Sequence, residues 1–138
     1  MIIVVGIGAD GMVGLAPASR AELVRATVIY GSPRQLDLLD DTVTAVRREW
    51  PSPMLPALRA VLDGADGDVH VVASGDPLLH DVGGSLVRLH GAHRVRVLPQ
   101  VSSVTLACAR LGWPVHDTEV ISLVTAEPHT AVRRGGRA

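Results

Sequence analysis

The tripeptide Gly75-Asp76-Pro77 has the residue types in this chain that are best suited to chemistry at a ligand. It follows Ser74 and the apolar run Val69 to Ala73. Gly75 lets the backbone come close to a ligand, Asp76 supplies an acceptor carboxylate, and Pro77 keeps Asp76 out of the helical region. Such a loop suits a neutral or cationic small molecule. The same residues also form ordinary tight turns, so the tripeptide alone leaves both interpretations open.

A glycine-rich loop, Gly6 to Gly11, follows the apolar amino terminus and matches the spacing G-x-G-x-x-G. In dinucleotide-binding proteins the third glycine opens a helix, and a carboxylate about 20 residues on holds the ribose. Here we expect the helix to begin late, at a capping box formed by Ser19 and Glu22. The second strand ends in Gly31-Ser32 without an acid. These features disfavour a nicotinamide or flavin site.

A third loop of small and polar residues, Pro99 to Ser103, follows the predicted strand Arg94–Leu98, and Ser102 or Ser103 is expected to cap the helix Val104 to Leu111. Each of the three loops follows the carboxyl end of a predicted strand. If these strands are parallel in one sheet, the loops open on the same edge and could line one crevice.

Strands and helices are expected to alternate along the chain. The predicted strands are Met1–Gly8, Thr27–Tyr30, Thr42–Arg47, Val69–Ala73, Arg94–Leu98 and a last strand Glu119–Val124. Two helices are predicted to begin at Ser19 and at Ser32-Pro33. Three further helices are predicted over Met54–Leu62, Val82–His90 and Val104–Leu111. The first strand is expected to be central and the third to lie near an edge. This alternation predicts an α/β fold with a doubly wound, mostly parallel, five-stranded sheet.

Composition limits the remaining possibilities. The 138 residues are expected to form one α/β domain over residues 1–124, with 125–138 as a linker or tail. With 47% hydrophobic residues and no Phe, the core must consist of Val, Leu, Ile and Ala. The net charge of −1 gives no reason to expect nucleic acid or an anionic membrane as partner.

The single cysteine, Cys108, excludes an internal disulfide, is expected in the core and fits a cytoplasmic location. The apolar amino terminus lacks a basic region and predicts a strand instead of a signal peptide. No apolar run is long enough for a membrane span. The six histidines are scattered, and the pair His90 and His93 lacks Cys or carboxylate partners at the spacing of a zinc site, so no metal site is expected.

Four motifs in order resemble one known family. They are Val5 to Gly11, Ser74 to Leu78, Pro99 to Ser103, and Ala109 to Pro114. Together they resemble the tetrapyrrole (corrin and porphyrin) methyltransferases, which use S-adenosylmethionine, over essentially the whole chain. The resemblance implies C-methylation of a precorrin in cobalamin biosynthesis, with this chain as the amino-terminal, cofactor-binding half of a homodimeric enzyme.

The resemblance also implies the site residues. Asp10 is the candidate to accept a proton from the macrocycle. The cofactor-binding residues would be Ala9, Ser74, Gly75, Asp76, Pro77, Leu79, Ser102 and Ser103. Asp76 could offset the ammonium or sulfonium charge, and alignment of the activated methyl group would supply most of the rate.

The chain departs from the family pattern in three ways. Leu79-His80-Asp81 stands where family members usually have an aromatic residue and a glycine, and Gln100 stands where they usually have glycine. The family has a second domain that this chain lacks, so we expect the 138 residues to be inactive alone. An alternative is a stand-alone α/β binding or interaction module without catalysis.

Overall fold

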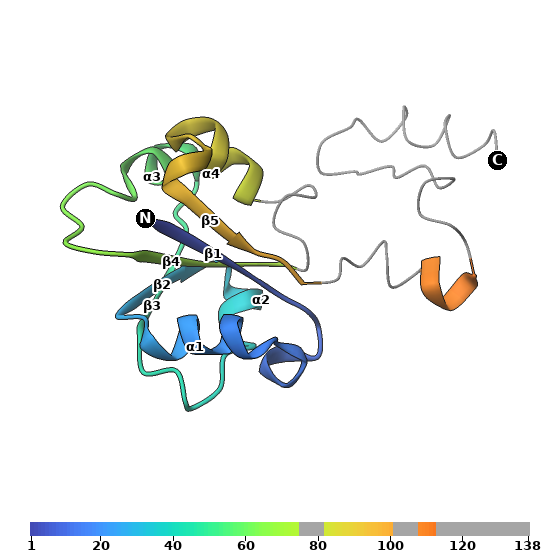
Figure 1. Ribbon diagram of the computed structural model, residues 1–138. Coiled ribbons are helices and arrows are strands. Elements are labelled where there is room, and N and C mark those ends of the chain that lie inside the picture. The colour runs from blue at the N-terminus through green and yellow to red at the C-terminus, as the bar shows by residue number, and fades with distance from the viewer. Residues whose placement is uncertain (75–81, 101–107, 113–138) are drawn as a thin grey trace, which may run out of the picture. The chain divides into compact units, whose positions relative to one another are not determined.

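The computed structural model describes residues 1–74, 82–100 and 108–112, and Figure 1 gives the arrangement of their elements. The chain divides into two units, Met1–Ser102 and Ser103–Ala138. The first unit contains a five-stranded sheet in the order β3-β2-β4-β1-β5, in which every pairing is parallel. The strands are β1 (Ile2–Ile7), β2 (Val28–Gly31), β3 (Val46–Glu49), β4 (Val69–Ser74) and β5 (Val95–Leu98).

Helices cover both faces of this sheet. Figure 1 shows α1 (Pro17–Arg25) and α2 (Pro33–Leu36) below it, and α3 (Leu55–Ala60) and α4 (Val82–His90) above it. Two 3-10 turns, η1 (Gly11–Gly14) and η2 (Ala92–Arg94), complete the elements. The doubly wound α/β fold predicted from the sequence is confirmed, with parallel pairing throughout the described sheet.

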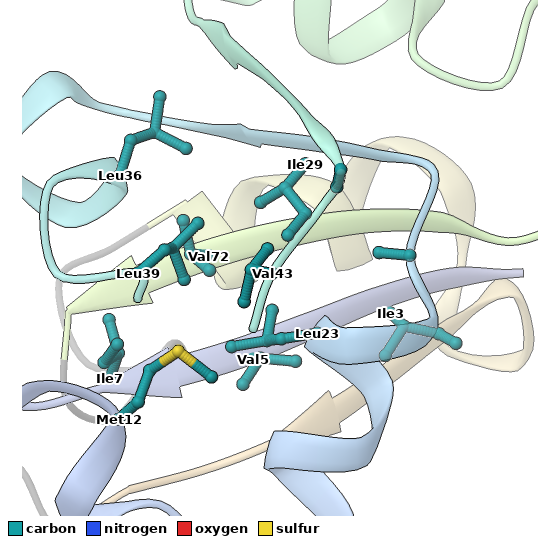
Figure 2. Close-up of a cluster of buried hydrophobic side chains, with 12 residues drawn as sticks. Ile3, Val5, Ile7, Met12, Leu23, Ile29, Leu36, Leu39, Val43 and Val72 are labelled. Atoms are coloured by element: carbon teal, nitrogen blue, oxygen red, sulfur yellow. The ribbon is translucent and has the colours of Figure 1, made fainter. Parts of the chain in front are cut away.

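The core is divided by the sheet into two clusters, because successive side chains of a strand point to opposite faces. On β1, Ile3, Val5 and Ile7 point toward α1 and α2, while Ile2 and Val4 point toward α3 and α4. Figure 2 shows the first cluster, in which Met12, Leu23 and Leu36 pack from η1, α1 and α2. Strands buried on both faces read as continuous apolar runs, which is why β1 and β4 could be predicted from the sequence.

The predicted capping box at Ser19 and Glu22 is wrong. Helix α1 begins at Pro17, whose fixed φ suits the first helical position, and Ser19 is buried inside the helix. The structure instead forms a capping box at Ser32 and Gln35, at the start of α2. The predicted helix start at Ser32-Pro33 is confirmed.

The third strand begins later than predicted, at Val46 instead of Thr42. Val43 and Ala45 are buried in the cluster of Figure 2 before the chain enters the sheet, so their alternation reflects a packed loop. The edge position of this strand is confirmed, since β3 ends the strand order. Strand β1 is internal, but β4 lies at the middle of the sheet.

In the second unit, the structure describes a short stretch. Residues 108–111 are helical and Cys108 is buried, as predicted. Gly112 follows with a φ of 71°, the left-handed conformation that commonly ends a helix. The predicted strand Glu119–Val124 and the proposed linker 125–138 lie outside the described residues.

Candidate functional site at the carboxyl edge of the sheet

The carboxyl ends of three strands meet at one edge of the sheet. Ile7 at the end of β1 pairs in register with Ser74 at the end of β4. On the other side of β1, Val5 pairs with Leu98, the last residue of β5. The loops after these strands therefore leave the same edge, as predicted. The crevice they could line remains a prediction.

Hydrogen bonds and one buried side chain fix the loop that follows β1. The Gly11 amide donates a hydrogen bond to the Gly8 carbonyl at 2.9 Å, and Gly11 adopts a φ of 68°. The Met12 side chain is buried in the cluster of Figure 2, and Arg20 donates to the Met12 carbonyl at 2.8 Å. Because Gly11 opens a 3-10 turn and α1 begins only at Pro17, the loop differs from the dinucleotide fingerprint, in which this glycine opens the helix.

Asp10 is an exposed residue of this loop, and its carboxylate lies beside the backbone of Gly8 and Gly14. A Cβ on Gly8 would come within 2.9 Å of the Asp10 carboxylate, and one on Gly14 would overlap the carboxylate. The side chain makes no capping hydrogen bond to η1. Gln100, from the loop after β5, donates to the Gly14 carbonyl at 2.6 Å and ties the two loops together. Asp10 thus presents an acceptor carboxylate at the carboxyl edge.

Ser74 is exposed at the end of β4 and accepts a hydrogen bond from Gln35 Nε2 at 2.7 Å. Gln35 lies in α2, the helix that follows β2. The end of β2 also lies tightly against β4, since a Cβ on Gly31 would come within 2.6 Å of Val72 Cγ2. A fourth strand end therefore contributes to this edge. Gln35 was missed in the sequence, although the spacing of Ser32 and Gln35 is itself a capping-box signal.

The structure describes some of the predicted site residues and not others. Ala9, Asp10 and Ser74 lie at the carboxyl edge, and all three are exposed. Gly75, Asp76, Pro77, Leu79, Ser102 and Ser103 lie outside the described residues, so their placement in the site stays a prediction.

Nearer the amino ends of the strands, charged side chains form a separate cluster that joins α1 to the sheet. His70, buried on β4, contacts Glu22 of α1 at 3.0 Å. Arg25 donates to both Glu22 and Asp68, at 2.7 Å each. Burial raises the pKa of Glu22, but hydrogen bonds from His70 and Arg25 more than offset this and lower it. The hydrogen bond from Arg25 also lowers the pKa of Asp68. This cluster fixes α1 and is not part of the candidate site.

Two further kinds of site were sought in the part of the chain that the structure describes. Its residues include no group of three or more His, Cys, Asp or Glu side chains placed to hold a metal ion. His90, one of the histidines considered for zinc, contacts the Leu58 carbonyl at 2.8 Å and so ties α4 to α3. No helix among the described residues is long and apolar enough to cross a membrane.

The fold and the candidate site together define a class of protein. The class is a doubly wound α/β domain in which the candidate ligand-binding loops follow strands that end at the carboxyl edge of a parallel sheet. Within that class, the chain belongs to the Tetrapyrrole (Corrin/Porphyrin) Methylases, a family whose pattern it matches over residues 1–137. The resemblance drawn from the four sequence motifs is confirmed.

Relatives agree with this assignment. The chain is 74% identical over 139 residues to the precorrin-6Y C(5,15)-methyltransferase [decarboxylating] of Mycobacterium tuberculosis, covering 100% of this chain and 35% of the relative. The enzyme of the same name from a Sinorhizobium species is 36% identical over 87% of this chain and 29% of the relative. The chain therefore spans about a third of these relatives.

Among solved structures, the cobalamin biosynthesis precorrin-6Y methylase of Archaeoglobus fulgidus matches with a TM-score of 0.73 and 28% identity, over 87% of this chain and 62% of that one. A uroporphyrin-III C-methyl transferase from Thermus thermophilus, complexed with S-adenyl homocysteine, matches with a TM-score of 0.59 and 21% identity, over 77% of this chain and 47% of that one. At this identity the second match shows the fold alone.

Proposed function

We propose that the protein is an S-adenosylmethionine-dependent methyltransferase that methylates a carbon of a precorrin in cobalamin biosynthesis. This chain supplies the amino-terminal, cofactor-binding half. The observation that carries the proposal is the 74% identity over the whole chain to a precorrin-6Y methyltransferase. Its geometric support is the convergence of the β1, β4 and β5 exits on one edge, where Asp10 and Ser74 are exposed.

Each loop has a proposed role. Ser74, Gly75, Asp76, Pro77 and Leu79 bind the cofactor, with Asp76 offsetting the positive charge of its sulfonium or ammonium group. Ser102 and Ser103 bind it from the loop after β5, and Ala9 from the loop after β1. The sulfonium is already activated, so holding its methyl group in line with the ring carbon supplies most of the rate.

Asp10 is proposed to accept the proton that the macrocycle releases. Its carboxylate is exposed at the carboxyl edge and lies beside Gly8 and Gly14, which carry no side chain that would displace it. We further propose that the enzyme acts in the cytoplasm and is a homodimer. Light scattering would measure the mass of the dimer.

The proposal is tested on the complete gene product. We expect saturable binding of S-adenosylmethionine by calorimetry, no saturable binding of NAD, and transfer of labelled methyl groups to precorrin-6Y. Asp76→Asn should weaken cofactor binding about tenfold, since it removes a charge-assisted contact. Asp10→Asn should lower kcat and leave cofactor affinity nearly unchanged.

Asp63→Asn is the matched control, because Asp63 is exposed after α3 and away from the carboxyl edge. It should behave as the unmodified protein does. Absence of methyl transfer by a folded, full-length protein would favour the alternative of a binding module without catalysis.

A further inference from the structure

Gln35 makes two side-chain hydrogen bonds in opposite directions. Its Oε1 accepts from the backbone N–H of Ser32 at 3.2 Å, which completes the capping box of α2. Its Nε2 donates to Ser74 Oγ at 2.7 Å, across 39 positions of sequence. One amide group therefore joins the start of α2 to the end of β4.

The first of these bonds fixes the direction of the second. A backbone N–H can only donate, so the amide atom facing Ser32 must be the oxygen. The nitrogen, which can only donate, then faces Ser74. The Ser74 hydroxyl must accept from Gln35, and its own proton is directed away from α2.

The backbone around Gln35 is fixed by several interactions. Pro33 fixes φ at the first helical position, and the Gln35 and Leu36 amides both bond to the Ser32 carbonyl, at 3.1 and 3.0 Å. Leu36 is buried in the cluster of Figure 2. The backbone that carries the Gln35 side chain is therefore fixed by hydrogen bonds and by the packing of Leu36.

We infer that Gln35 is a positioning residue for cofactor binding: it sets the orientation of the Ser74 hydroxyl at the edge where the adenosyl group is proposed to bind. The inference rests on the proposed function. Gln35 itself need not touch the cofactor, because it acts through Ser74. The capping box thus serves the site as well as the helix.

The test uses the full-length protein and S-adenosylhomocysteine as the probe, titrated by calorimetry. Gln35→Met keeps the length of the side chain and removes both hydrogen bonds. Ser32→Ala is the matched control, since it removes the other half of the same capping box and leaves the donor to Ser74 in place. Melting temperatures of the two variants are compared first, so that any loss of helix capping is measured separately.

We expect Gln35→Met to weaken binding of S-adenosylhomocysteine about five- to tenfold, and Ser32→Ala less than twofold. In a Ser74→Ala background, Gln35→Met should cause no further loss, because the partner through which it acts is gone. A merely structural role would weaken binding equally in both backgrounds.

Two results overturn the inference alone: unchanged affinity in Gln35→Met, or the same loss with and without the Ser74 hydroxyl. If the unmodified protein does not bind S-adenosylhomocysteine, the proposed function fails and this inference fails with it. The two failures are distinguished by the first titration.

Discussion

Asp10 owes its position to two glycines that leave space for it. Gly8 and Gly14 both lie where a Cβ would press on the carboxylate, and Gln100 holds the Gly14 carbonyl in place. The departure from the family pattern at Gln100 is therefore a tie between two loops of the site. The sequence marks Gln100 as unusual but cannot indicate its partner, which lies 86 positions away.

At position 14, we predict that Gly14→Ala displaces the Asp10 carboxylate and lowers kcat at least tenfold, with a small change in melting temperature. Asp10 is exposed and can move aside without opening the core. Methyl transfer at saturating cofactor measures the effect. Gly67→Ala, at a glycine with open space around it, is the control. If Gly14→Ala lowers kcat just as much in an Asp10→Ala background, the loss does not act through Asp10.

Among the elements, α1 has few buried residues. Its two buried residues are Ser19 and Leu23, and Leu23 is fully buried against β1. We predict that Leu23→Ala lowers the free energy of unfolding by about 2–5 kcal/mol, the usual effect of such a cavity. Val24→Ala, on the same helix and 42% exposed, should change it by less than about 0.5 kcal/mol. Urea unfolding of both variants makes the comparison, and equal effects would contradict this account of α1.

The contact of α1 with β4 also predicts an acid sensitivity. The pKa of Glu22 is lowered in the folded state, so as pH falls the unfolded chain takes up a proton before the native one does. The stability from Glu22 is fully present above its unfolded pKa of about 4.3 and is lost as pH falls through the lower native value. Glu22→Gln should therefore reduce stability at neutral pH and flatten its decline between about pH 5 and pH 3. Glu49→Gln, at an exposed position on β3 outside this cluster, is the control variant.

Elements differ in how far the sequence could predict them. Strands β1 and β4 are buried on both faces, and their largely apolar runs, with His70 as the polar exception in β4, predicted their bounds to within one residue. The start of α1 was misplaced because Ser19 and Glu22 have capping-box spacing, while Glu22 is used by His70 and Arg25. Local spacing cannot reveal a competing partner on a distant strand. For the candidate site, Asp10 and Ser74 were implied by the family resemblance, whereas the hydrogen bonds from Gln35 and Gln100 could be found only from the fold.

For the whole molecule, we predict that the 138 residues produced alone fold but transfer no methyl group. Both core clusters lie within the first unit, Met1–Ser102, which therefore has a core of its own. The cofactor is proposed to bind between this half and a second domain, and the chain spans 35% of its Mycobacterium tuberculosis relative. Loss of one wall should weaken binding of S-adenosylmethionine at least tenfold, about 1.4 kcal/mol. Circular dichroism and calorimetry test the two halves of this prediction, and turnover by the isolated chain would contradict it.

The strand order of the sheet also determines how long β1 waits for its partners during synthesis. The amino-terminal strand β1 pairs with β4 and β5, so Ile2 meets Val69 and Val95 as its neighbours. At synthesis rates of about 5–20 residues per second, on the order of ten seconds separate the synthesis of β1 from that of β5. During that interval β1 has at most one of its two neighbours, β4. Strand β5 therefore completes the pairing of β1 only after most of the first unit has been made.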